Sequence, residues 1–206
     1  HIRVVRMLVK HCHFFANSAN VNDLIPLDHL KRNVLGMIKK RLYFFLNHTF
    51  SHWPYDASFR LVLETWLSYI QPWRYSVGCG GVDEEAEARI VHPERWQGFI
   101  NENVLFYTTL LRYQLCRFSR MDLTSNKNAF MLYRICKVYS QEHLLGMVKR
   151  ADVQVENPQT GGAAEWEKRG VVARQIADVL GPGYSYASVF DPNFREFMVQ
   201  LLLTAH

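Results

Sequence analysis

Cysteines, strand-forming runs and long apolar stretches are scarce in this chain, and each scarcity excludes a class of protein. The cysteines are widely spaced and form no Cys-x-x-Cys pair, which favours buried free thiols in a reducing compartment: Cys12, Cys79, Cys116 and Cys136. No apolar run approaches the ~20 residues that a helix needs to cross a bilayer, so the chain itself is not expected to span a membrane. No run of alternating β-branched residues appears either, so strands are not predicted.

The composition is that of a folded protein. Hydrophobic residues make up 49% and aromatic residues 14% of the 206 residues, which excludes a disordered tail. A chain of this length forms one domain or two small ones. The formal charge of +5 suits an anionic membrane surface or nucleic acid without requiring either. Because no nucleic-acid-binding module is recognisable, a nucleic-acid partner is not expected.

Helical periodicity begins at the first residues. Over residues 1–17 an apolar stripe predicts an amphipathic helix with one basic face, the stripe comprising Ile2, Val5, Val9 and Cys12 and the face Arg3, Arg6, Lys10 and His13. A second helix is predicted over 27–49, with inward positions Leu27, Leu30, Val34, Ile38, Leu42 and Phe45 and with Arg32, Lys39 and Lys40 outward. These basic side chains suit contact with an anionic lipid surface or an acidic partner, and a solvated helix face is the plainer interpretation.

Further helices are predicted in the second half of the chain, after a Gly-rich and acidic linker over 76–91. A long helix begins near Pro93 and carries an inward stripe as far as Phe118. The next helix follows a cap at Thr124 or Ser125, with the stripe Ala129, Leu132, Tyr133 and Cys136. A shorter helix over 141–150, a loop over 151–165 and a helix ended by Gly181 precede the last helix, which Asp191 caps before Pro192.

These patterns together predict an all-α fold, an irregular bundle or solenoid of about eight amphipathic helices. Residues 1–152 are expected to form one helical region. Residues 153–206 are expected to form a C-terminal helical extension packed on the same core.

The segment from Trp53 to Tyr75, WPYDASFRLVLETWLSYIQPWRY, is the most distinctive of the chain and is called the signature segment below. Asp56 stands where an N-cap carboxylate accepts the free amides of a first helical turn. Six apolar residues then share one helical face: Phe59, Val62, Leu63, Trp66, Leu67 and Ile70. Pro54 and Pro72 bound the helix, because proline has no amide donor and a fixed φ. The pattern indicates a rigid aromatic clasp between neighbouring helices.

The chain resembles the neutral sphingomyelinase 3 family, also called the sphingomyelin phosphodiesterase 4 family, at four strings within this segment. They are His52-Trp53-Pro54, Asp56-Ala57-Ser58-Phe59-Arg60, Trp66-Leu67-Ser68-Tyr69 and Gln71-Pro72-Trp73-Arg74-Tyr75. The residues that carry the resemblance are Trp53, Pro54, Asp56, Phe59, Arg60, Trp66, Tyr69, Pro72, Trp73, Arg74 and Tyr75. Weaker similarity extends to Val138 and resumes near Phe190, and residues 153–189 show none.

The resemblance implies a membrane-associated protein of the endoplasmic reticulum and nuclear envelope that is linked to nuclear-pore components. It further implies magnesium-dependent hydrolysis of sphingomyelin to ceramide and phosphocholine. The family protein is much longer and carries a hydrophobic C-terminal anchor, so this chain is expected to be a piece from its middle.

The residues themselves indicate no catalytic site. Magnesium-assisted hydrolysis needs converging carboxylates, and the densest acidic group, Asp83 to Glu87, falls in the predicted linker. His48 and His52 have the spacing of a zinc pair on a helix, but the glutamate of HExxH is missing, and the side chains of His11, Cys12 and His13 diverge around a helix. No metal or other cofactor is therefore expected in this chain.

An aromatic cage for phosphocholine, with its rim at Trp73, Arg74 and Tyr75, is a further hypothesis. Two functional interpretations remain. The chain is either a non-catalytic helical region of a sphingomyelin phosphodiesterase or a protein-protein scaffold at the endoplasmic reticulum, nuclear envelope and nuclear pore.

Overall fold

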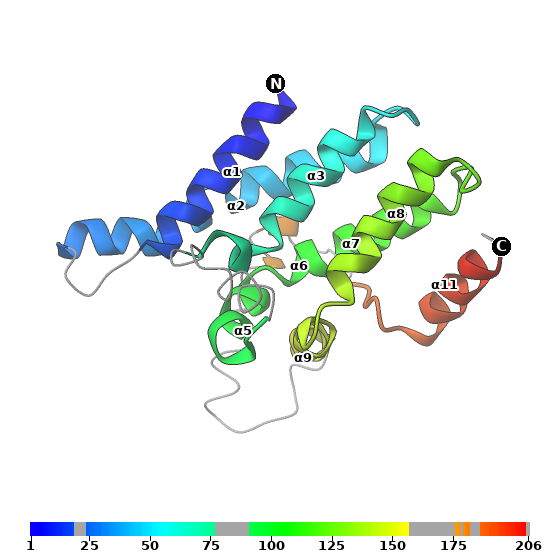
Figure 1. Ribbon diagram of the computed structural model, residues 1–206. Helices are drawn as coiled ribbons and strands as arrows, with labels where there is room; N and C mark the ends of the chain where they lie inside the picture. The colour runs from blue at the N-terminus through cyan, green and yellow to red at the C-terminus, as the bar shows by residue number, and fades with distance from the viewer. Residues whose placement is uncertain (19–23, 77–90, 157–175, 178, 182–185, 205–206) are drawn as a thin grey trace. The chain divides into compact units, whose positions relative to one another are not determined.

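The structure, a computed structural model, describes residues 1–18, 24–76, 91–156, 176–177, 179–181 and 186–204 (Figure 1). Within these ranges the regular elements are all helices, which confirms the predicted all-α class. The chain divides into two compact units, residues 1–91 (unit 1) and residues 92–206 (unit 2), and each is described by itself. The prediction of a helical region over 1–152 and an extension over 153–206 on the same core is not tested by this division and stays a prediction.

Unit 1 is built around one short helix that its neighbours enclose. Its elements are α1 (Ile2–Asn17), α2 (Ile25–His52), α3 (Phe59–Tyr69) and the 3₁₀ turn η1 (Pro72–Tyr75). Each of the three α-helices contacts the other two, and η1 contacts α1. In Figure 1, α1 and α2 lie along α3. The six apolar positions predicted for the signature helix are all at most 2% exposed, so they form the core of this unit.

The second helix departs from its prediction in its first half. Leu27 and Leu30, expected to face inward, are 39% and 45% exposed. The buried apolar side chains lie toward the C-terminal end instead, at Leu42, Tyr43, Leu46 and Phe50. Length explains the difference, because α2 has 28 residues and α3 only 11. At ~1.5 Å per residue, α2 is much longer than α3, so α3 cannot cover the first half of α2.

Unit 2 begins with three short helices where one long helix was predicted. They are α5 (Pro93–Glu102), α6 (Val104–Tyr107) and α7 (Thr109–Phe118). The breaks fall at Asn103 and Thr108, whose side chains donate to the carbonyl oxygens of Phe99 and Val104, at 2.8 Å and 2.9 Å. Such side chains offer the backbone an alternative to the regular helical ladder and bend or interrupt helices.

The next helix, α8 (Asn126–Tyr139), buries a different stripe from the predicted one. Tyr133 and Cys136 are exposed, whereas Met131, Ile135 and Val138 are buried. Both stripes have helical spacing, so the choice depends on the partner surface. The Tyr139 hydroxyl donates to the Tyr107 carbonyl oxygen at 2.8 Å and helps to set the rotation of α8.

The remaining helices of unit 2 are α9 (Leu144–Glu156) and α11 (Pro192–Thr204). The predicted loop over 151–165 is wrong at its start, because α9 continues to Glu156. The predicted cap of α11 is confirmed, since the Asp191 carboxylate accepts the Asn193 amide at 2.9 Å. Gly181 has φ 84° and its amide bonds to the Ala177 carbonyl oxygen, the geometry that ends a helix at glycine. Most of the helix predicted before it lies outside the described residues, as do residues 77–90 of the predicted 76–91 linker.

Candidate functional site

The signature segment opens with a turn that holds itself together. The indole nitrogen of Trp53 donates to the Ser58 hydroxyl at 2.9 Å, and that hydroxyl donates to Oδ1 of Asp56 at 2.5 Å. The same carboxylate oxygen accepts the Ser58 amide at 2.8 Å. The prediction that Asp56 is the N-cap is therefore wrong, because the cap position belongs to Ser58. Asp56 shapes the turn that precedes the helix, and Pro54 beside it is exposed.

The helix that follows is buried on nearly every side, not only along the predicted apolar face. Its polar residues Glu64, Thr65 and Ser68 are each at most 4% exposed. Thr65 and Ser68 satisfy their hydroxyl groups within the helix, by donating to the carbonyl oxygens one turn earlier at 2.9 Å and 2.7 Å. Because these polar groups have internal partners, the helix can be enclosed by protein without a large desolvation cost.

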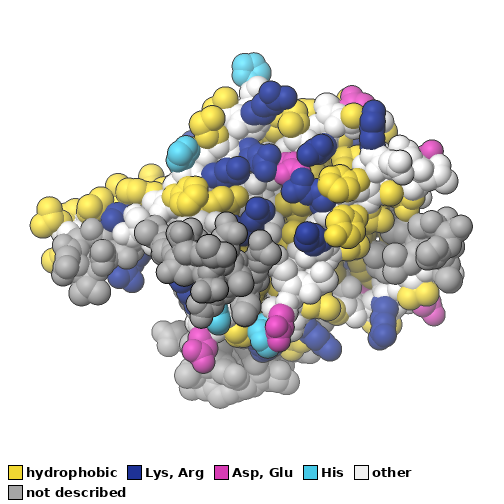
Figure 2. Space-filling model, in the orientation of Figure 1, with side chains coloured by type: hydrophobic (Ala, Val, Ile, Leu, Met, Phe, Trp, Pro, Cys, Tyr) yellow, Lys and Arg dark blue, Asp and Glu magenta, His cyan; other side chains and the backbone are white. Residues whose placement is uncertain are grey.

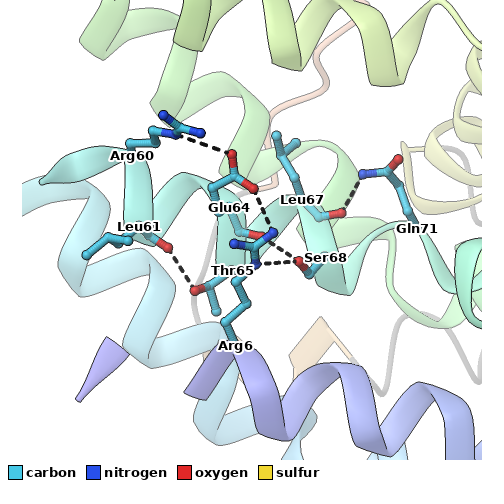
Figure 3. A network of polar contacts seen from close by, with 8 residues as sticks. All are labelled: Arg6, Arg60, Leu61, Glu64, Thr65, Leu67, Ser68 and Gln71. Atoms are coloured by element: carbon cyan, nitrogen blue, oxygen red, sulfur yellow. Dashed lines mark hydrogen bonds and ion pairs between the residues drawn. The ribbon is translucent and has the colours of Figure 1, made fainter. Parts of the chain in front are cut away.

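Glu64 is the charged centre of this site, and Figure 3 shows the network around it. Its carboxylate lies 2.8 Å from the guanidinium of Arg6 on α1 and 3.7 Å from that of Arg60 on α3. Arg6 also donates to the Ser68 hydroxyl at 3.1 Å. The Glu64 side chain is 6% exposed, so the pairing with Arg6 compensates a carboxylate that water hardly reaches. This pairing joins α1 to the signature helix.

The second link between α1 and the signature segment is His13, which the sequence placed on a solvated basic face. The imidazole is fully buried, and its Nε2 lies 3.0 Å from the Tyr69 carbonyl oxygen. A carbonyl oxygen only accepts, so Nε2 carries the proton. The ring stacks on Tyr75 at 5.3 Å. Burial lowers the pKa of His13 from 6.5 to about 4, so the side chain is neutral at pH 7.

The hypothesis of a phosphocholine cage at the end of the segment is not supported as drawn. Trp73 and Tyr75 are 2% and 6% exposed and belong to the core, while Arg74 points to solvent. Pro72 also serves the packing, because its carbonyl oxygen accepts the side-chain amide of Asn17 on α1 at 3.0 Å. Two buried rings do not present open faces to a quaternary ammonium group.

The basic residues predicted to contact an anionic surface fall into different environments. Arg3 is exposed, whereas Arg6 and Lys10 are half-buried along the side of α1 that meets the signature segment. On α2, Arg32 pairs with Asp28 at 2.8 Å. Lys39 is half-buried and Lys40 is exposed. Contact with an anionic surface stays a prediction for this set.

A cluster that the sequence did not indicate does form, and we call Arg6, Lys10, Arg60 and Arg74 the basic cluster. Burial lowers the pKa of Arg6, and the neighbouring charges of Arg74 and Arg60 lower it further. Burial also lowers the pKa of Lys10, with added contributions from Arg6 and Arg74. In Figure 2, Lys and Arg side chains gather on the visible face. Glu64 is the acidic partner in the ion pairs of this cluster within the described chain.

Metal chemistry finds no support in the described ranges, where no three His, Cys, Asp or Glu side chains are placed to hold an ion. The residues there do not fit the oxygen-ligand set that magnesium prefers. His48 and His52 stack at 4.2 Å, and Nδ1 of His52 lies 2.9 Å from the His48 carbonyl oxygen. The Asp83 to Glu87 group lies outside the described residues. No described helix is long and apolar enough to cross a membrane.

Unit 2 contains a polar cluster of its own that the sequence analysis missed. Asp152 on α9 is 1% exposed, and its carboxylate accepts the hydroxyl groups of Tyr186 and Ser188. Arg112 donates to the Ser188 carbonyl oxygen at 3.0 Å. Residues 186–188 are thereby anchored to α9 and α7. The signal was hidden because Asp152 fell in a predicted loop.

Comparison with known proteins shows which family the chain resembles. A family model described as mitochondrial-associated sphingomyelin phosphodiesterase matches residues 1–180. Sphingomyelin phosphodiesterase 4 of Xenopus laevis is 48% identical over 159 residues, covering 72% of this chain and 19% of that protein. The Mus musculus protein of the same name is 42% identical over 230 aligned positions, covering 98% of this chain and 28% of that protein. For the Homo sapiens protein, identity is 43% over 162 residues, covering 74% and 19%.

The chain thus spans only 19% to 28% of the length of the human and mouse relatives. No solved structure matches it significantly. The family match also covers residues 153–180, which showed no resemblance at the level of short strings. With most of its length matched by the family model, the chain belongs to the family of mitochondrial-associated sphingomyelin phosphodiesterases.

Proposed function

We propose that this chain is a helical, non-catalytic region of a membrane-associated sphingomyelin phosphodiesterase. One observation carries the proposal: the polar residues of the signature segment and of α1 bond to other groups of the protein. Asp56 shapes a turn, Glu64 is paired with two arginines, and His13 bonds to the backbone of Tyr69. A general base or a metal ligand needs a lone pair directed toward substrate or ion. The carboxylates of Asp56 and Glu64 are engaged by protein donors, and the His13 imidazole is fully buried.

The whole protein, on this proposal, hydrolyses sphingomyelin to ceramide and phosphocholine with magnesium, and residues outside this chain supply the reacting groups. The names of the relatives support the reaction. The helical region supplies a rigid support, because its signature helix is held by α1 and α2 through both apolar packing and the Glu64 pairing.

Phosphocholine release tests the proposal directly. The 206-residue chain and a full-length relative that contains the homologous region are assayed side by side on sphingomyelin vesicles, with and without magnesium. We expect release by the full-length protein only, and only with magnesium. A full-length Glu64→Asp variant, matched in charge, is expected to lower thermal stability without changing kcat at low temperature. Magnesium-dependent release by the chain alone would refute the non-catalytic assignment.

A scaffold that binds protein partners, including nuclear-pore components, is the second candidate function. The observation that favours it is an apolar stripe on α2 with large exposed side chains, Leu27, Leu30, Met37 and Phe44 at 39%, 45%, 69% and 47%. Exposed apolar stripes of this kind mark docking surfaces for other helices. Cross-linking at Met37 in cells tests it, with Arg32, which is exposed about 140° around α2 from Met37, as the control. Capture of pore components at Met37 only would favour the scaffold, and equal capture at both positions would count against it.

The proposed location is the membrane of the endoplasmic reticulum and nuclear envelope, with attachment through a C-terminal anchor outside this chain. The family description names mitochondria, so the two locations compete. Imaging of a tagged full-length protein against markers of each membrane distinguishes them. An exclusively mitochondrial signal would refute the proposed location.

A further inference from the structure

The outer face of α1 is apolar, although α1 already buries an apolar face in unit 1. Four large side chains on its solvent side are between 46% and 65% exposed: Val4, Met7, Leu8 and Phe14. Their spacing places them within about one third of the helix circumference, with the exposed His11 among them and the buried Val9 on the opposite side. Single exposed apolar residues are ordinary, but a row of four along one helix face indicates a surface for a partner.

The basic cluster lies along the flank of this apolar face. Lys10 follows Met7 by one helical turn on α1, and Arg74 adjoins Tyr75, against which the Phe14 ring packs edge-on at 5.1 Å. Neither Lys10 nor Arg74 forms an ion pair with an acidic side chain in the parts of the chain that the structure describes. Hydrophobic and basic side chains also lie next to one another on the face that Figure 2 shows.

We infer that α1 docks on the surface of an anionic phospholipid bilayer, with Met7, Leu8 and their apolar neighbours entering the headgroup region and Lys10 and Arg74 binding lipid phosphates. The inference rests on the proposed function only in placing the protein at a membrane. A helix with one apolar face and basic residues beside it is the form that lies in the plane of a bilayer interface. An α-helix of 16 residues is ~24 Å long and is suited to lie on the surface, not to span it.

A lipid surface fits these observations better than an acidic protein or nucleic acid. Nucleic acid would use the basic residues and leave the apolar row exposed to water. An anionic bilayer satisfies both features at once, because apolar side chains enter it while the phosphates neutralise the basic cluster. Burial is the main cause of the lowered pKa of Arg6 and Lys10, and the repulsion among the basic side chains, which adds to it, is relieved by such a surface.

Vesicle sedimentation with the 206-residue chain provides the test. The probes are phosphatidylcholine vesicles with and without one-third phosphatidylserine. A Lys10→Gln/Arg74→Gln variant is expected to bind the anionic vesicles about 25-fold more weakly, at about fivefold for each basic residue near a charged surface. Its thermal stability is expected to stay the same or rise slightly, because the two residues repel their neighbours and pair with no described acid. A structural role for these residues would instead lower stability.

A charge-matched control removes two lysines from α8, in the other unit. Lys127 and Lys137 are exposed there, and Lys127→Gln/Lys137→Gln is expected to change binding less than about twofold. In the apolar row, Met7→Gln/Leu8→Gln is expected to weaken vesicle binding about tenfold or more while leaving the fold intact.

Three outcomes would overturn the inference. The first is equal binding of wild type to neutral and anionic vesicles, and the second is equal loss of binding in the α8 control. The third concerns competition for the anionic vesicles. If millimolar inorganic phosphate displaces the chain from them as effectively as added anionic lipid does, the basic residues form a site for soluble phosphate. The test is separate from that of the proposed function, since vesicle binding is measured without sphingomyelin hydrolysis.

Discussion

Acidification is expected to destabilise unit 1 through one buried side chain, His13. The imidazole is held between the Tyr69 carbonyl oxygen at 3.0 Å and the Tyr75 ring at 5.3 Å, out of reach of water. Burial lowers its pKa from 6.5 to about 4, and the bond to Tyr69 opposes part of that decrease. Because each pKa unit corresponds to about 1.4 kcal/mol, the fall from 6.5 to about 4 corresponds to about 3 kcal/mol of stability.

The direction of the effect follows from which state binds the proton. Unfolding exposes His13 and restores the ordinary pKa of 6.5, so between about pH 4 and pH 6.5 the unfolded chain binds a proton that the folded chain does not. The contribution is therefore fully present above pH 6.5, decreases as the pH falls, and is lost below about pH 4. Urea unfolding at about pH 7.5 and about pH 4.5 measures the difference in the free energy of unfolding.

Two variants isolate the contribution of His13 from that of the carboxylates. His13→Phe keeps a ring against Tyr75 but cannot be protonated, so its unfolding free energy is expected to fall about 2.5 kcal/mol less than that of wild type between the two pH values. His11→Gln, at an exposed position on the same helix, is expected to keep the full dependence. Equal losses in wild type and His13→Phe would refute the reasoning.

Three further predictions concern stability. Glu64→Gln leaves the half-buried Arg6 without its counter-ion and is expected to lower the free energy of unfolding by about 2 kcal/mol. A second change, Arg6→Met, is expected to restore part of this loss, and additive losses in urea unfolding would contradict the coupling. Within the signature segment, Trp66→Ala is expected to cost about 4 kcal/mol and Arg74→Ala at most about 0.5 kcal/mol, so similar melting temperatures would disprove the division into core and surface positions. Asp152→Ala removes the acceptor of two hydroxyl groups and is expected to cost about 2 kcal/mol and to speed amide hydrogen exchange over residues 186–194; unchanged exchange would show that the anchoring is unimportant.

The helical class and the core of the signature helix were predictable because they depend on local periodicity. The apolar positions from Phe59 to Ile70 recur at helical spacing, and no alternative element competes for them. The break of the 93–118 helix was not predictable, since Asn103 and Thr108 interrupt a helix only when tertiary packing favours their bonds to the backbone. The prediction of the buried stripe of α8 was wrong for a related reason, because the helix has two apolar faces of similar strength and the surface that it packs against selected one.

The candidate site depends on contacts between residues far apart in the sequence, and periodicity carries no information on these. Arg6 looked like one residue of a solvated basic face, and its pairing with Glu64 becomes visible only when α1 lies on the signature helix. His13 was placed on that same face, although the structure buries it completely. Arg60 and Arg74 were noted for their place in the signature segment, but their proximity to Arg6 required the fold.

The enclosed position of α3 has a consequence for biosynthesis. His13 and Tyr69 are 56 residues apart, and Arg6 and Ser68 are 62 residues apart, so unit 1 closes only after long stretches of chain have been made. The helices α1 and α2 leave the ribosome before α3, and their apolar faces stay exposed to solvent until α3 emerges. Nascent chains that stall before residue 69 has left the ribosome are therefore expected to recruit chaperones or to aggregate, whereas chains whose residue 75 has emerged close quickly.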